Sequence, residues 1–137
     1  MSNPSSFLEL VREVFRPTHR GVAGLVDDLL GLCPEQGLQL DWCADHCRVC
    51  SVGVEPVEFI EVPLPKSVFR AVLARLATLC NERNPGSVSP YGGEGELLVG
   101  VDRATVCRVA FANTSNAQRV RLTRIVQDNQ EGERQRP

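Results

Sequence analysis

Four side chains that can bind metals fall within one short segment of the sequence. They are Cys43, His46, Cys47 and Cys50, so the thiols have the spacing CxxxCxxC with a histidine between them. Thiolate sulfur and imidazole nitrogen are ligands for zinc, and thiolates hold iron–sulfur clusters. The motif therefore raises the hypothesis of a metal-binding protein that holds zinc or an iron–sulfur cluster.

The thiol spacing is similar to the cluster-binding motif of radical S-adenosylmethionine enzymes, and Gly92-Gly93-Glu94 is similar to their GGE element. In those enzymes GGE ends a buried strand, whereas Pro90 comes shortly before it here. The segment 47–50 also alternates like a strand, which places Cys47 and Cys50 on opposite faces of a sheet. We therefore favour the interpretation that the thiols are small buried hydrophobic side chains, reduced in a cytoplasm, and we expect no cofactor.

The sequence offers little for catalysis by a nucleophile or on a nucleotide. His46 could form a Cys–His dyad with Cys80 or Cys107, but nothing around the histidines indicates a nucleophile. The glycine-rich segment 91–95 lacks the GxxxxGK[ST] spacing of a phosphate-binding loop. We expect that the chain is not an enzyme.

Two arginines alternate along a segment that has the period of a strand. Arg119 and Arg121 fall on one face of the strand expected over 118–126, where they could bind an acidic partner or the phosphates of nucleic acid. No aromatic side chains alternate with them to stack on bases, and the net charge of −2 gives no overall basic field. We therefore do not favour a nucleic-acid partner, and a solvated sheet face is the alternative to a binding surface.

Apolar residues recur with a helical period in three segments. The first two, over 5–16 and in a helix opened by Thr18, are expected to form a helical hairpin over residues 5–33. The third covers 68–80 and is the strongest helical pattern in the chain. Ser67 is its expected cap.

Alternation with a period of two predicts the strands. They are expected at 38–42, 47–51, 57–62, 96–101, 105–112 and 118–126, with a long loop over 81–95. Strands that follow one another so closely pair antiparallel. The expected fold class is α+β in the order ααβββαβββ. A single domain is expected over 1–126, with the sheet and one packed helix over 38–126, followed by a disordered charged tail over 127–137.

The composition fits one small globular domain. The chain has 137 residues, of which 42% are hydrophobic and 23% are charged. Its aromatic side chains are only five Phe, one Trp and one Tyr, so we expect a mostly aliphatic core. No segment approaches the roughly 20 apolar residues of a membrane span, and the first residues lack the pattern of a secretion signal. We expect no membrane insertion and a cytoplasmic location.

Several short motifs recur in the order of one known module. They are Arg48-Val49-Cys50 with Gly53, Pro65 followed by 72–76 (VLARL), Pro90-Tyr91-Gly92-Gly93-Glu94, 96–100 (ELLVG), Cys107-Arg108-Val109-Ala110 and 119–125 (RVRLTRI). Together they resemble the domain that precedes the RecA-like core in the ATPases of type II secretion and type IV pilus assembly, the GspE/PulE family.

The resemblance covers about Leu38 to Ile125 and implies a bacterial, stand-alone relative that lacks the motor domain. It implies docking onto another protein, such as a secretion or pilus-type ATPase or an assembly component. Arg108 is the basic position that it carries over, whereas Glu94 stands where the family has an arginine.

The leading hypothesis is a non-catalytic, cytoplasmic protein-interaction or regulatory module. The residues that we expect at the contact are Arg108, Arg119, Arg121, Tyr91 and Glu94, and the segment 84–95 is expected to be a flexible recognition loop. A metal-binding protein that uses Cys43, His46, Cys47 and Cys50 is the alternative.

Overall fold

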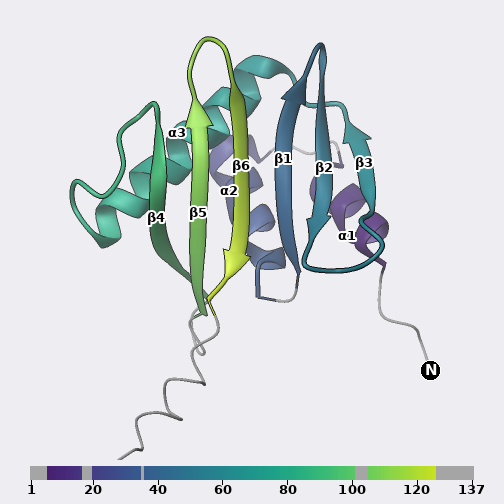
Figure 1. The fold of residues 1–137 in the computed structure, drawn as a ribbon, viewed down its shortest axis with the longest axis horizontal. Helices are drawn as coiled ribbons and strands as arrows, with labels where there is room; N and C mark the ends of the chain where they lie inside the picture. Colours follow the sequence, from purple (N-terminus) through teal and green to yellow (C-terminus); the bar gives the residue numbers. More distant parts are fainter. Residues whose placement is uncertain (1–5, 17–19, 35, 101–104, 126–137) are drawn as a thin grey trace, which may run out of the picture.

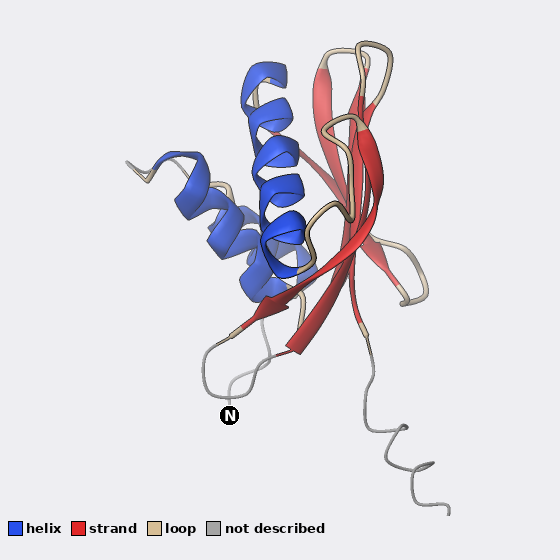
Figure 2. Ribbon diagram, turned by 90° about the vertical axis from the view of Figure 1, so that its left-hand side faces the viewer, coloured by secondary structure: helices blue, strands red, loops and turns tan. Residues whose placement is uncertain are grey.

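Within the part of the chain that the computed structural model describes, three helices cover one face of a six-stranded antiparallel sheet (Figures 1 and 2). The structure describes residues 6–16, 20–34, 36–100 and 105–125. The helices are α1 (Phe7–Val14), α2 (Gly21–Leu32) and α3 (Lys66–Arg83). The strands are β1 (Gly37–Cys43), β2 (His46–Val52), β3 (Phe59–Val62), β4 (Gly92–Val99), β5 (Thr105–Asn113) and β6 (Gln118–Arg124). This is the α+β class in the expected order ααβββαβββ.

A side chain caps the start of α1, whereas α2 and α3 begin without a side-chain cap. At α1, the Ser6 hydroxyl accepts from the Glu9 backbone N–H while the Glu9 carboxylate accepts from the Ser6 N–H, which is a complete capping box. At α3, the expectation that Ser67 caps the helix is wrong. The carbonyl of Pro65 already accepts from the Phe69 N–H at 2.9 Å, so Ser67 lies inside the first turn. The start expected for the second helix, Thr18, lies outside the described residues.

The sheet consists of two three-stranded meanders that meet at its centre. The strand order is β3-β2-β1-β6-β5-β4, so β1 from one meander pairs antiparallel with β6 from the other. Leu38 lies opposite Leu122 and Leu40 lies opposite Val120 along this central pair. Helix α3 connects the two meanders and crosses behind β4, β5 and β6 (Figure 1).

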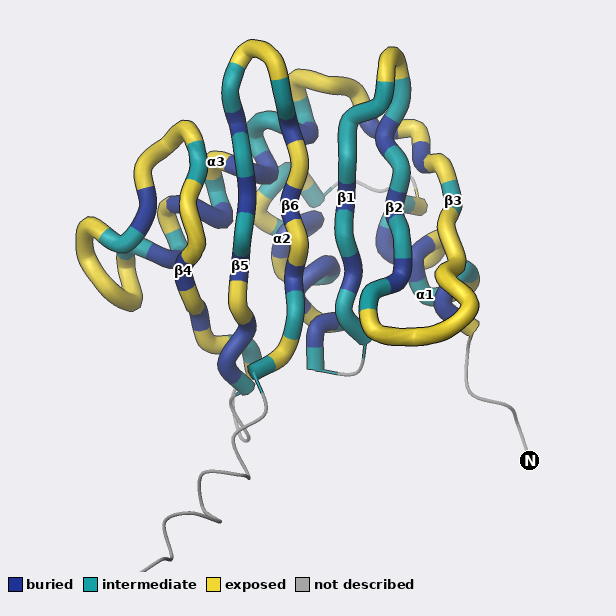
Figure 3. Tube along the Cα trace, viewed as in Figure 1, coloured by how far each residue is buried: buried dark blue, intermediate teal, exposed yellow. Residues whose placement is uncertain are grey.

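The core lies between the helices and one face of the sheet. Successive strand residues alternate between buried and accessible, as the colours of the tube show in Figure 3. Helix α3 supplies the largest share of the helix layer, with Phe69, Val72, Leu73 and Leu76 fully buried. Most of the remaining core side chains are Leu and Val, which confirms the aliphatic core expected from the composition.

Helix α2 packs against α3, and the shorter α1 packs against α2 and β3. The helical segment expected over 5–33 therefore joins the same helix layer as α3. No helix within the described ranges is both long and apolar enough to cross a bilayer.

Strand β4 begins earlier than the sequence pattern indicates. The segment 81–95 was expected to be a loop, but α3 extends to Arg83 and β4 starts at Gly92, so the connection spans only 84–91. The Asn81 side chain holds this connection in place, because its amide donates to the Val88 carbonyl and its oxygen accepts from the Val88 N–H. Val88 is thereby buried against β4.

Glycine at position 95 makes this packing possible. A β-carbon on Gly95 would lie 3.0 Å from Val88 Cγ1 and 3.1 Å from Cys80 Sγ, which is tighter than an ordinary contact. Position 95 of β4 is a glycine because Val88 and Cys80 pack closely against the strand there. The expected tail over 127–137 and the final residue of the strand expected over 118–126 lie outside the described residues.

Candidate functional site

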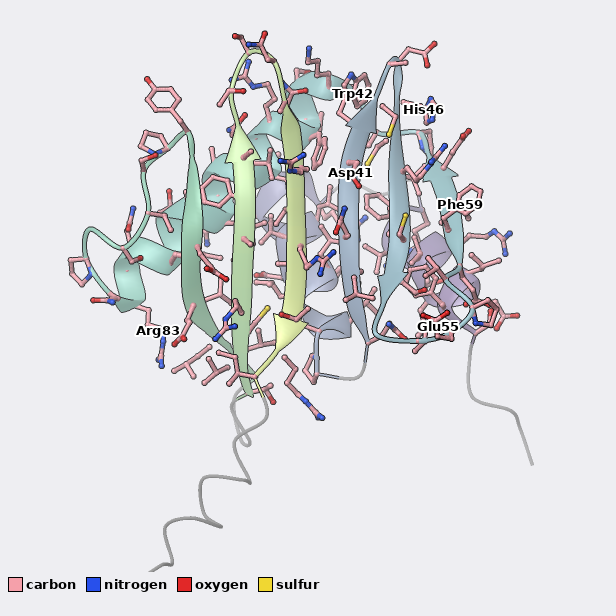
Figure 4. All side chains as sticks on the ribbon, viewed as in Figure 1. Asp41, Trp42, His46, Glu55, Phe59 and Arg83 are labelled. Carbon is pink, nitrogen blue, oxygen red and sulfur yellow. The ribbon has the colours of Figure 1, made fainter. Side chains whose placement is uncertain are left out.

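The face of the sheet opposite the helices is not covered by any described element (Figure 2). We call it the open face. Its side chains are those that alternate with the core residues along each strand. In Figure 4 this face is turned toward the viewer, and Asp41 on β1, His46 on β2 and Phe59 on β3 are labelled on it.

Charges of opposite sign follow one another across four strands of the open face. Arg48 lies opposite Glu61 on one side and opposite Asp41 on the other, and Asp41 in turn lies opposite Arg119. Directly opposed side chains on one face of an antiparallel pair stand close enough to interact. Among the described residues none of these neighbours forms an ion pair within 4.0 Å, so the row sets opposite charges beside one another without closing them into pairs.

A shallow hollow of about 490 Å³ lies next to this row. Its lining residues are Gln39, Gly93, Ala110, Phe111, Ala112, Arg119, Val120 and Arg121. The hollow exists because Ala112 lies opposite Arg119 and Ala110 lies opposite Arg121, so short side chains on β5 stand beside long ones on β6. The result is an apolar floor with two guanidinium groups along one wall.

One of these arginines is held by a short chain of hydrogen bonds. The Nε of Arg121 donates to Gln39 Oε1 at 2.9 Å, and Gln39 Nε2 donates to Asp41 Oδ2 at 2.9 Å. Within the described part of the chain, no carboxylate oxygen comes within 4.0 Å of the side-chain nitrogens of Arg119 or Arg121. Both arginines are exposed, so their charges are available to an acidic group from outside.

The structure brings the expected contact residues together from separate parts of the sequence. Arg119 and Arg121 lie on β6, Arg108 lies on β5, and Glu94 lies on β4, all on the open face. The Nε of Arg108 is 4.0 Å from a carboxylate oxygen of Glu94. Tyr91 directly precedes β4; its backbone carbonyl accepts from the Asn113 N–H, and the residue is 67% exposed.

Sequence reasoning missed the residues that surround these arginines. Gln39 and Asp41 border them on β1, and Ala110 and Ala112 form the floor on β5. The alternation of polar and apolar residues along both strands does indicate that they share a face. Nothing in that alternation shows which strand is the neighbour of β6.

The cysteine motif forms a hairpin. Cys43 and His46 are cross-strand neighbours at the tight turn between β1 and β2, where Ala44 has a φ of 59°. Cys47 faces the core and is fully buried, whereas Cys50 lies on the open face, as the alternation of 47–50 predicted. The four side chains therefore do not converge on one point.

His46 is instead surrounded by carboxylates. Its Nδ1 is 3.1 Å from Asp45 Oδ1, and its Nε2 is 3.1 Å from Glu61 Oε2, although the latter contact lacks hydrogen-bond geometry. Cys50 lies four residues further along the same strand, which is roughly 13 Å at 3.3 Å per residue. The described residues contain no group of three Cys, His, Asp or Glu side chains arranged to hold a metal.

The thiols of β2 resist ionisation. Burial, with smaller effects of Asp41 and Cys43, raises the pKa of Cys47 to about 12. Burial and then Asp41 also raise the pKa of Cys50 above the ordinary value of a thiol. Because the thiolate is both the nucleophile and the metal ligand, the environment of these two sulfurs disfavours each role.

The expected alternatives for catalysis do not assemble either. Cys80 and Cys107 are both buried on the helix side of the sheet, whereas His46 lies on the open face, so no Cys–His dyad forms. The two glycines of the segment that is similar to the GGE element, Gly92 and Gly93, form the first residues of β4.

The sequence matches no model of a known protein family and no curated protein.

Proposed function

We propose that this chain is a non-catalytic protein-interaction module that binds an acidic segment of a partner protein on its open face. The observation that supports the proposal most is the hollow between β5 and β6. It combines an apolar floor, Ala110 and Ala112, with two exposed arginines that have no carboxylate partner within the described residues. The contact residues expected from the sequence lie on or beside this hollow.

The chemistry of the hollow favours carboxylates. Guanidinium groups offer paired N–H donors that match the two oxygens of a carboxylate. The hydrogen bond from Arg121 to Gln39 fixes the orientation of one guanidinium before binding, which reduces the entropy lost on association. Asp41 on one side and Glu94 on the other would repel an acidic segment that shifted sideways, so they define its position.

Residues 38–125 resemble the domain that precedes the motor core of secretion and pilus ATPases. This resemblance supports a partner protein from an assembly of that kind. We propose a bacterial cytoplasmic setting and a partner from a secretion or pilus-type assembly, with Arg108 as the contact residue in common. Glu94 departs from the family pattern, so this chain places a carboxylate beside Arg108 where the family has an arginine.

Binding of a labelled acidic peptide tests the proposal. The probe is a fluorescent decapeptide of alternating Glu and Gly, and the reference is the same peptide with Gln in place of Glu. We expect the wild-type chain to bind the Glu peptide in preference, with an affinity that falls as salt is added. The double variant Arg119→Glu/Arg121→Glu should lose affinity by about tenfold or more, as expected for two exposed pairs turned repulsive.

Two arginines on the helix layer provide the matched control. Arg12 and Arg83 are exposed on α1 and α3 and do not line the hollow, so Arg12→Glu/Arg83→Glu changes the net charge equally while both arginines of the hollow remain. This control should bind as tightly as the wild type. Equal loss in both double variants, or no preference for the Glu peptide, would refute the proposed site.

A further inference from the structure

Two thiols from distant parts of the sequence meet inside the protein. Cys33 lies at the C-terminal end of α2 and Cys107 lies on the core side of β5. Their sulfur atoms are 2.9 Å apart and share a hydrogen bond, although the residues are separated by 74 positions in the sequence. The side chains are 1% and 0% exposed, so the pair is enclosed by protein.

We propose that Cys33 and Cys107 are a site of reversible oxidation, at which a hydroperoxide converts the two thiols into an intramolecular disulfide. This inference is independent of the proposed function, because neither sulfur lies on the open face. A hydroperoxide is the suitable oxidant class, since hydrogen peroxide is small enough to reach a buried sulfur during local opening.

The surrounding structure keeps the two sulfurs together. Arg124 on β6 donates to the carbonyl of Pro34 at 3.1 Å, which ties the end of α2 to the strand next to β5. A disulfide requires sulfur atoms about 2.05 Å apart, so they need to approach by less than one ångström. Formation of the cross-link therefore requires only a small movement of the two sulfur atoms.

The two thiols are chemically unequal. The hydrogen bond with Cys107 and the charge of Arg124 lower the pKa of Cys33. The same hydrogen bond, together with burial, raises the pKa of Cys107. Cys33 is therefore the thiol that ionises and attacks the peroxide, and Cys107 is the thiol that resolves the product.

The reaction balances in two steps. The Cys33 thiolate attacks one peroxide oxygen, the O–O bond breaks, and the leaving hydroxide takes a proton to form water, which leaves a sulfenic acid on Cys33. The sulfur of Cys107 then attacks the sulfenic sulfur, the S–O bond breaks, and the Cys107 proton leaves with the hydroxide as a second water. Overall, two thiols are oxidised to one disulfide and hydrogen peroxide is reduced to two water molecules.

Cys80 is the competing partner for Cys107. It is buried on α3, and it lies close enough to Cys107 for its charge to raise the pKa of that thiol. A link between Cys80 and Cys107 would join α3 to the sheet, whereas the proposed link joins α2 to it. A decisive test must distinguish these two pairings.

Peptide mapping of the full-length chain makes this distinction. Reduced protein is treated with hydrogen peroxide, blocked with iodoacetamide under denaturing conditions, and digested with trypsin without reduction. The cleavage sites place Cys33 in peptide 21–48, Cys80 in peptide 76–83 and Cys107 in peptide 104–108. We expect a covalent pair of 21–48 with 104–108 that lacks two hydrogen atoms and separates on reduction.

Two variants identify the sulfur within peptide 21–48, which also contains Cys43 and Cys47. Cys33→Ser should abolish the linked pair, whereas the matched control Cys43→Ser should leave it intact. A link from 104–108 to 76–83 would overturn the proposal. The proposal would also be overturned if the 104–108 peptide from wild-type protein were alkylated and unlinked. In that case a circular dichroism spectrum must show that the protein stayed folded during the peroxide treatment.

Discussion

The side-chain amide of Asn113 is bonded to Arg70 at both of its ends. Its Oδ1 accepts from Arg70 Nε at 2.8 Å, and its Nδ2 donates to the Arg70 backbone carbonyl at 3.3 Å. Asn113 is the last residue of β5 and Arg70 lies in the second turn of α3, so this reciprocal pair connects the helix layer to the sheet. Asn113 is 7% exposed, and water therefore cannot replace these bonds readily.

Replacing Asn113 should destabilise the protein substantially. Asn113→Ala leaves the half-buried Arg70 guanidinium without its acceptor, and loss of a hydrogen bond to a charged group typically costs about 1–3 kcal/mol. We expect a loss of that size in the free energy of unfolding, measured by urea denaturation. Asn116→Ala in the exposed β5–β6 turn is the matched control and should change stability by less than about 0.5 kcal/mol. A similar loss in both variants would show that the Arg70 bonds contribute little.

Gly95 should be intolerant of even a methyl group. Gly95→Ala places a carbon about 3 Å from Val88 and Cys80, and overpacking of this kind costs about 1–3 kcal/mol. Gly31→Ala on the exposed side of α2 meets no atom within 4 Å, so it should stabilise the helix by up to about 1 kcal/mol. Thermal unfolding of both variants measures the two effects. Stabilisation by both substitutions would contradict the packing role of Gly95.

Cys47 should make the fold sensitive to alkaline pH. An unfolded thiol ionises near pH 9.0, whereas burial holds the pKa of folded Cys47 at about 12. Between these values the unfolded state binds fewer protons than the folded state, so stability falls as pH rises. The slope from this one group reaches about 1.4 kcal/mol per pH unit.

Cys47→Ala should remove that part of the slope. Urea denaturation at several pH values between 9 and 12 should show a shallower decline for the variant than for the wild type. At pH 6–8 the two proteins should differ by a constant amount, which reports only the lost packing. Parallel curves over the alkaline range would mean that Cys47 ionises as easily in the folded protein as in the unfolded one.

The order of elements could be predicted from the sequence because periodicity is a local property. The period of two in 47–51 and the helical period in 68–80 each report which side of an element is buried. The start of β4 could not be predicted in this way. Gly92 and Gly93 have the composition of a loop. The close approach of Gly92 to the Phe111 carbonyl and of Gly93 to Val88 explains why glycines occur within a strand here.

The candidate site could be predicted only in part for the same reason. Alternation within one strand places Arg119 and Arg121 on a common face. Their neighbours Asp41 and Ala112 depend on strand pairing, which no local pattern specifies. The contact between Cys33 and Cys107 is equally non-local, since the helical and strand patterns around each cysteine indicate only that both are buried.

The central pairing of β1 with β6 has a consequence for how the protein is made. Gln39 and Arg121, which meet across this pair, are 82 residues apart. During synthesis, β1 leaves the ribosome long before β6 exists, and its inner edge stays unpaired for most of that time. The nascent chain therefore completes the middle of its sheet in a late step, and translation of β6 sets the earliest moment at which the open face can exist.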